Sequence, residues 1–331
     1  MTHQPVAWVT GATGFLGRHA AAGLSKAGWR VVSFARVMPD RGMDTGADAG
    51  CVGMRTPTRW MIGPFDVECL HQASQAEAAP SLVVHGLGVG SVTAAAAFPV
   101  DAFDATVRST AVLLDHLRRM APDARILYPS SAAVYGESLN ALEEQAPTRP
   151  VSTYGWHKLL VETMLQEARV LHGLECTAIR FFSVYGPELR KQVLWDWGRR
   201  LLAGEAPLAA SGTGEEIRDF LYINDAVALL IWLATLPRGI APAIVNGGTG
   251  CGTSLRQLAG LLTDALGCRT PVVFDGQRRQ GDPFCYRADP GLLSSLGFAP
   301  AVSVQDGVSR YARWLQDAHD GRAQDAGALS L

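Results

Sequence analysis

The stretch Val6-Ala-Trp-Val-Thr-Gly-Ala-Thr-Gly-Phe-Leu-Gly17 decides the fold of this chain. Its first four residues are apolar, as expected for a buried parallel strand, and a helical pattern begins at Arg18. The glycines between strand and helix form the turn that a dinucleotide-binding loop requires. Gly11 permits the tight turn, Gly14 lets the backbone approach a pyrophosphate, and Gly17 lets the helix pack closely on the strand.

Apolar strands and helical patterns continue to alternate along the chain. Strands are predicted at 28–36, 61–66, 81–85, 124–129 and 176–182, with a helix at 101–120. Later segments are a helix at 191–204, a strand at 217–223 and helices at 226–236 (capped by Asn224-Asp225), 254–266 and 302–316. We therefore expect an α/β protein with a Rossmann-type, doubly wound parallel sheet over 1–182. A smaller mixed α/β part that binds substrate is expected over 183–316, followed by a flexible tail at 317–331.

Bulk composition limits the classes of partner. The chain has 331 residues, 48% of them hydrophobic, and a net charge of −2, so nothing favours nucleic acid or an anionic membrane. Its six cysteines are scattered, without a CxxC pair or a histidine cluster, which argues against a disulfide framework and a metal site. No signal peptide or long apolar run is visible, so we expect a soluble, cytoplasmic protein.

The end of the second predicted strand bears on the choice of cofactor. In NAD-binding proteins an acidic residue usually stands there and accepts hydrogen bonds from the ribose. Here the position holds Ala35, followed by Arg36. An arginine suits the 2′-phosphate of NADP, although Arg36 is equally explained by a solvated side chain or one stacked on adenine. NAD and NADP both remain open.

A second group of residues carries acid–base chemistry. Ser130 and Ser131 follow a predicted strand, and Tyr154 and Lys158 stand four residues apart in a strongly helical run, so the latter two share one face. A free phenol has a pKa of about 10, too high for a base at neutral pH. A nearby ammonium group would lower that pKa and let Tyr154 exchange a proton with a substrate hydroxyl held by Ser131.

Taken together, the loop Thr10–Gly17 and the serine, tyrosine and lysine set resemble the extended short-chain dehydrogenase/reductase family, which includes nucleotide-sugar epimerases and dehydratases. The resemblance covers residues 5–316. It implies a catalytic triad of Ser131, Tyr154 and Lys158, where Ser131 is preferred to Ser130 because it stands four residues before Tyr135-Gly136.

The same resemblance implies the binding residues and the partners. For the cofactor these are Gly11, Thr13, Gly14, Phe15, Leu16, Gly17, Arg36, Asp66, Val67, Gly86, Leu87, Ser130, Tyr154 and Lys158. For a nucleotide-sugar substrate they are Ser131, Ser183, Arg218, Arg279 and Asp282. Ser183 stands where the family usually has an asparagine. A homodimer formed through the helices near 101–120 and 154–170 is also implied.

Three functions remain open. Dehydratases of the family have an acid–base pair directly after the triad serine or threonine, and Ala132 and Ala133 stand there instead. An NAD(P)-dependent nucleotide-sugar 4-epimerase with a transient 4-keto sugar fits best. An NADPH-dependent reductase of nucleotide 4-keto sugars would use the same residues. A cofactor-binding regulator without turnover fits least, because such relatives typically lose the tyrosine or the lysine.

Overall fold

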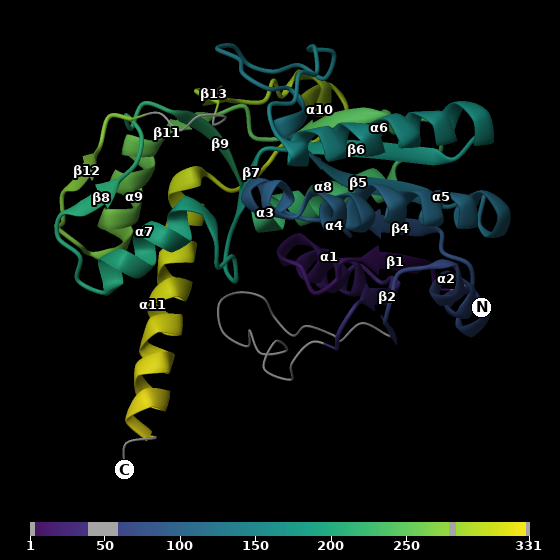
Figure 1. Cartoon of the computed structure of the whole chain (residues 1–331), viewed down its shortest axis with the longest axis horizontal. Coiled ribbons are helices and arrows are strands. Elements are labelled where there is room, and N and C mark those ends of the chain that lie inside the picture. The colour runs from purple at the N-terminus through teal and green to yellow at the C-terminus, as the bar shows by residue number, and fades with distance from the viewer. Residues whose placement is uncertain (1–3, 39–58, 278–282, 329–331) are drawn as a thin grey trace.

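A seven-stranded sheet with helices on both faces forms the larger part of the molecule (Figure 1). The computed structural model describes residues 4–38, 59–277 and 283–328, and beyond residue 320 it describes only the backbone. The strands of this sheet are β1 (Val6–Thr10), β2 (Arg30–Ala35), β3 (Arg59–Ile62), β4 (Leu82–His85), β5 (Arg125–Ser131), β6 (Glu175–Phe181) and β10 (Ile244–Gly247).

All neighbouring strands in this sheet are parallel, in the order β10-β6-β5-β4-β1-β2-β3. The chain moves outward from β1 to β3 and then returns to place β4 on the other side of β1. This reversal confirms the predicted doubly wound topology and puts the switch point between β1 and β4. In such sheets ligands bind beyond the carboxyl ends of the strands at the switch point. The segments that leave there are residues 11–17 and 86–90, which we call the 11–17 loop and the 86–90 loop.

Side chains on the two faces of the large sheet pack into two separate hydrophobic cores. Trp8 belongs to the core under α2 (Val67–Ala76), α5 (Ser109–Met120) and α6 (Thr153–His172). Its neighbours Ala7 and Val9 belong to the core under α1 (Phe15–Lys26), α8 (Ile223–Thr235) and α10 (Gly291–Ser295). Because β1 is buried on both faces, its sequence is continuously apolar rather than alternating.

Three short helical segments precede α5, and one follows β5. They are α3 (Val92–Ala97), α4 (Pro99–Phe103), the π-helical turn η2 (Asp104–Arg108) and the 3₁₀ turn η3 (Ala132–Val134).

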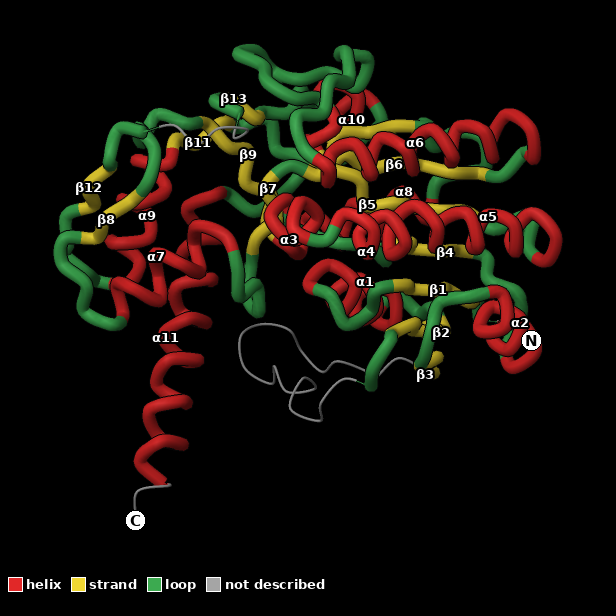
Figure 2. The backbone as a smooth tube through the Cα atoms, in the orientation of Figure 1, coloured by secondary structure: helices red, strands yellow, loops and turns green. Residues whose placement is uncertain are grey.

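The C-terminal part forms its own core beside the carboxyl edge of the large sheet (Figure 2). A mixed sheet has the order β11-β9-β13, with β7 also paired to β9, and β8 and β12 form a two-stranded sheet. These elements are β7 (Ser183–Tyr185), β8 (Leu208–Ala210), β9 (Ile217–Tyr222), β11 (Gly252–Ser254), β12 (Val272–Phe274) and β13 (Cys285–Tyr286), with α7 (Gln192–Leu202), α9 (Leu255–Leu266) and α11 (Val304–Ala328). The predicted mixed α/β character of this part is confirmed.

Several predicted boundaries differ from the structure because capping side chains were assigned wrongly. The strand predicted to end at Asp66 ends at Ile62, and Asp66 caps α2 by accepting a hydrogen bond from the backbone of Cys69 at 2.9 Å. Asn224-Asp225 does not cap α8, since the helix begins at Ile223 and Asp225 instead accepts from the backbone of Val302.

Helix α11 also differs from its predicted end at residue 316. It continues to Ala328 and so includes most of the segment 317–331, for which the sequence predicts a flexible tail. That segment has few large apolar residues, but four of its residues are alanine, which has the highest intrinsic helix propensity.

Candidate active site

The 11–17 loop is shaped as a backbone cradle open to an anion. Gly11 has a φ of +66°, and a Cβ there would lie 2.6 Å from the carbonyl oxygen of Gly86, so the two loops meet backbone to backbone. A Cβ on the exposed Gly14 would meet only the oxygen of Gly11, at 3.1 Å. Gly14 is the N-cap of α1 and offers no side chain to the first N–H groups of the helix. These free donors fit a dinucleotide diphosphate.

Hydrogen bonds between uncharged groups connect the 86–90 loop to the ends of β1 and β4. The hydroxyl of Thr10 accepts from the backbone N–H of Leu87 at 3.1 Å and lies 2.8 Å from Nδ1 of the fully buried His85. The hydroxyl of Thr110 donates to the carbonyl of Thr106, so it accepts from Nε2 of His85, and Nδ1 accepts from Thr10. Burial, and secondarily Lys158, lowers the pKa of His85 to about 3, which keeps the imidazole neutral.

The three predicted catalytic residues meet at the carboxyl end of β5. Ser131 is the last residue of that strand, and its hydroxyl forms a side-chain hydrogen bond with Tyr154 from the first turn of α6. Gly155 makes this approach possible, since a Cβ there would lie 2.5 Å from the carbonyl oxygen of Ala133. Lys158 lies one turn further along α6, with its Nζ 5.7 Å from the centre of the Tyr154 ring.

The electrostatics of the tyrosine differ from the expectation. Burial raises the pKa of Tyr154, and only the hydrogen bond with Ser131 acts in the lowering direction. The predicted lowering of this pKa by Lys158 is therefore not found. Lys158 is buried and donates to the carbonyl of Pro129 at 2.7 Å, and burial lowers its pKa to about 8, opposed by Glu162. Desolvation dominates both groups.

A buried ion pair that the sequence analysis missed supports this corner. Glu162, one turn beyond Lys158 on α6, accepts from Arg180 on β6 through Nη2 at 2.7 Å and Nε at 3.1 Å. Both side chains are 3% exposed. The hydroxyl of Ser130 also donates to Glu162, and the Arg180 guanidinium lies 4.6 Å from the centre of the Tyr135 ring. Two features of the sequence point to this pair: residues 154, 158 and 162 recur every four positions, and Arg180 stands between the apolar residues Ile179 and Phe181 of a predicted strand.

This arrangement agrees with a comparison of the chain with known proteins. The sequence profile of the NAD dependent epimerase/dehydratase family matches residues 7–248. The chain belongs to this family, an extended branch of the short-chain dehydrogenases/reductases.

Three of the proteins that this chain resembles match it over almost its whole length. A UDP-glucose 4-epimerase from Azospirillum brasilense is 29% identical, with 98% of this chain and 96% of that protein covered. A probable UDP-glucuronate 4-epimerase from Rhizobium meliloti (strain 1021) is 27% identical, with 92% and 95% covered. The solved structure of MoeE5 in complex with UDP-glucuronic acid and NAD is 27% identical with a TM-score of 0.79, covering 95% of this chain and 99% of that one.

The predicted cofactor residues Arg36, Asp66 and Val67 lie at the edge of the large sheet formed by β2 and β3. All three are exposed and follow β2 and β3, on the far side of the switch point from the triad. Phe15, Leu16 and Thr13 belong to the 11–17 loop and the start of α1, and Leu87 to the 86–90 loop. The predicted cofactor residues of these segments all lie at the carboxyl edge of the large sheet. Ser130 is also predicted to contact the cofactor, but its hydroxyl donates to Glu162.

Two of the predicted substrate residues lie on the C-terminal sheet. Ser183 begins β7 and Arg218 lies on β9, where its guanidinium is 5.7 Å from the Tyr286 ring and donates to the carbonyl of Phe284 at 3.4 Å. Arg279 and Asp282 lie outside the described residues.

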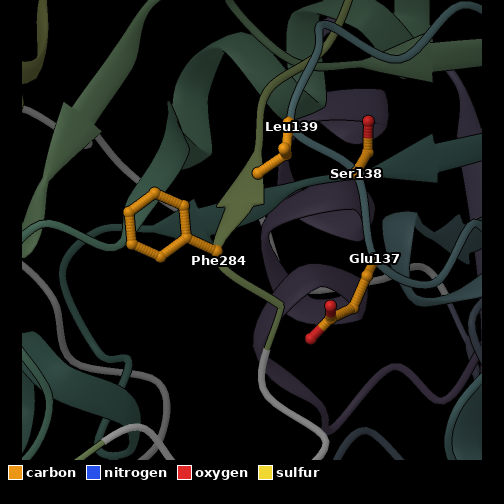
Figure 3. A pocket seen from close by; sticks show the side chains of 4 residues that line it. All are labelled: Glu137, Ser138, Leu139 and Phe284. Atoms are coloured by element: carbon orange, nitrogen blue, oxygen red, sulfur yellow. The ribbon is translucent and has the colours of Figure 1, made fainter.

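A pocket of about 510 Å³ is lined by Glu137, Ser138, Leu139 and Phe284, the last of which accepts the hydrogen bond from Arg218 (Figure 3). Figure 3 shows that its side chains come from two segments, one just after the triad strand and one just before β13. Among the described residues there is no cluster of metal-ligating side chains and no helix that could span a membrane.

Proposed function

We propose that this chain is an NAD-dependent UDP-sugar 4-epimerase that works through a transient 4-keto sugar. The observation that carries the proposal is the meeting of Ser131, Tyr154 and Lys158 beside the glycine cradle of the switch point. The named relatives support the substrate class, because two of them are UDP-sugar 4-epimerases by name.

The residues present fit NAD. The 11–17 loop offers free N–H groups and no acidic side chain in the first turn of α1, where a diphosphate would be held. When bound there, the nicotinamide supplies both the acceptor and the donor of the hydride at C4 of the sugar.

Tyr154 is the acid–base group of the proposal. As phenolate it takes the proton of the 4-hydroxyl while the C4–H bond breaks, and as phenol it returns that proton after the keto sugar has turned over. Ser131, bonded to the phenol, aligns the sugar oxygen with it. Lys158, held by the carbonyl of Pro129, places a positive charge beside the phenolate when that anion forms.

Elimination of water is disfavoured by the residues after Ser131. Ala132 is buried and Ala133 is packed against the first turn of α6, and neither can donate or accept a proton. The triad therefore serves proton exchange at one hydroxyl and offers no second acid–base pair for a dehydration.

The test is interconversion of UDP-glucose and UDP-galactose by the purified protein, alongside UDP-glucuronate and UDP-N-acetylglucosamine as substrates. We expect one of these to be epimerised, and Tyr154→Phe to lower kcat by about 10²–10⁴-fold while cofactor binding is kept. Full activity of Tyr154→Phe would refute the triad assignment.

Arg36 supports a second candidate, an NADPH-dependent reductase of nucleotide 4-keto sugars. Its exposed side chain directly follows β2, where NAD enzymes usually carry a carboxylate. Denaturing the purified protein and identifying the released nucleotide separates the two. Tightly held NAD supports the epimerase, whereas an empty site that prefers NADPH over NADH supports the reductase.

A homodimer is proposed through the outer faces of α4 and α6. Val100 on α4 is 72% exposed and Trp156 on α6 is 54% exposed, and Phe103 and Leu160 beside them are also exposed. Large apolar side chains gathered on two packed helices favour a covered interface. Light scattering at micromolar concentration tests this, and a monomer would contradict it.

A further inference from the structure

The segment 186–192 leaves the C-terminal part and crosses to the carboxyl edge of the large sheet. Glu188 and Gln192 adopt φ values of +72° and +68°, which non-glycine residues rarely do. Leu189 between them is 3% exposed in the C-terminal core, and its carbonyl accepts from the Tyr311 hydroxyl at 2.8 Å. The segment is thus bonded to α11 at Leu189, and the left-handed backbone of Glu188 and Gln192 changes the direction of the chain on either side of it.

Glu188 connects this segment to the start of α1 and, through Arg18, to the 11–17 loop. Its carboxylate accepts from Nη1 of Arg18 at 3.1 Å and lies 3.6 Å from Nε2 of His19, both in the first turns of α1. Arg18 in turn donates through Nη2 to the carbonyl of Thr13 at 3.1 Å. The carboxylate side chain is only 20% exposed, so this contact is partly shielded from solvent.

Lys191 connects the same segment to the 86–90 loop. Its Nζ donates to the carbonyl of Gly90 at 2.9 Å, and a Cβ on Gly90 would lie 3.3 Å from that Nζ. Glu188 and Lys191 are three residues apart, yet they reach the loops on the two sides of the switch point between β1 and β4. The segment is therefore bonded directly to the 86–90 loop and, through Arg18 at the start of α1, to the 11–17 loop, so it links the two loops that would hold a dinucleotide.

We propose that Glu188 and Lys191 are positioning residues that retain the bound dinucleotide by fastening the C-terminal part across the two loops. The proposal rests on the proposed function, because an epimerase reuses one NAD in every turnover and must not lose it between the two hydride transfers. Neither residue touches the reacting atoms in this scheme. They slow the escape of the cofactor and couple it to the part of the chain that holds the predicted substrate residues Ser183 and Arg218.

The experiment measures the dissociation rate of NADH from the full chain by the loss of its fluorescence after displacement with excess NAD. Glu188→Gln keeps the size and backbone strain of the residue and removes its charge. Lys191→Met keeps the apolar stem and removes the donor. The matched control is Glu215→Gln, which breaks an exposed carboxylate–arginine pair of 2.9 Å with Arg256, away from both loops. The urea midpoint of each variant is measured in parallel.

We expect Glu188→Gln and Lys191→Met each to release NADH about tenfold faster, as loss of one charge-assisted hydrogen bond implies, while Glu215→Gln releases it like the wild type. Unchanged release by both variants would overturn the proposal, and so would equal acceleration by the control. A wild-type protein that binds neither NAD nor NADH would overturn the proposed function as well. If NAD is retained but no UDP-sugar is epimerised, the function fails while the retention result stands.

Discussion

The two sides of the carboxyl edge of the large sheet are built from different chemistry. At β1 and β4 the loops are held by hydroxyls, backbone groups and a neutral imidazole, His85. At β5 and β6 the support is ionic, with Glu162 paired to Arg180 below the buried Lys158. The first side is expected to receive an anionic diphosphate, and a buried carboxylate there would repel it. The second side must hold an ammonium group near a phenol, and buried charges of both signs do this.

This contrast predicts that different substitutions destabilise the two regions. Around β5 and β6, removal of one partner of the ion pair should lower the free energy of unfolding, because the other partner is left charged in the interior. Around β1 and β4, a change in backbone shape or in the protonation of His85 should lower it. The following substitutions test that distinction.

Glu162→Ala should have the largest effect on stability. It leaves Arg180 buried without its carboxylate and Ser130 without its acceptor, so we expect a loss of about 3–5 kcal/mol in the free energy of unfolding, measured by urea denaturation. Glu215→Ala, which breaks an exposed pair, should cost less than about 1 kcal/mol. The double variant Glu162→Met with Arg180→Leu should be less destabilised than Glu162→Ala. If it is not, the charge pair is not what the single change disrupts.

Gly11→Ala should have an intermediate effect. The new Cβ would meet the Gly86 carbonyl in a left-handed backbone, so we expect a loss of about 1–3 kcal/mol and impaired NAD binding. Gly260→Ala is the matched control, since nothing lies within 4 Å of a Cβ there and the position is in the interior of α9. It should stabilise the protein by about 0.5–1 kcal/mol. Equal urea midpoints for the two variants would contradict the close approach of the loops.

His85 should make stability depend on pH in the acid range. Its pKa is about 3 in the folded protein against 6.5 for the ordinary side chain, so between these values only the unfolded state binds the proton. The stabilisation is complete above pH 6.5 and is lost as the pH falls. Wild type should lose about 1.4 kcal/mol per pH unit more than His85→Gln between pH 6 and 4, measured by urea unfolding. Parallel profiles would show that the imidazole titrates normally in the fold.

Local sequence patterns were enough to predict the fold and the close approach of Ser131, Tyr154 and Lys158. The run from Val6 to Gly17 contains the strand, cradle and helix start in consecutive residues, and the doubly wound sheet follows from repeating that pattern. Tyr154 and Lys158 are neighbours on one helix, and Ser131 ends a strand, so their meeting needed only the rule that parallel strands present their carboxyl ends together. The roles assigned to these residues and to the binding residues remain predictions.

The missed features depend on partners that are distant in sequence. His85 is 75 residues from Thr10 and 25 from Thr110, and no local pattern reports such a contact. Likewise Glu188 meets Arg18 across 170 residues. The Asp66 boundary failed for a local reason, since an aspartate after an apolar run ends a strand or begins a helix equally well.

The π-helical turn at Asp104–Arg108 puts the two ends of one long helix out of phase. Its wide turn is closed by the bond from the backbone N–H of Ser109 to the carbonyl of Asp104, one residue wider than an α-turn. One additional residue corresponds to a rotation of about 100°, so Phe103, which an unbroken helix would bring to within about 40° of Leu117, is exposed although Leu117 is buried. An alignment with relatives that have an unbroken α-helix here would need a one-residue gap within this turn. Without it, each position upstream would be compared with a residue about 100° away around the helix.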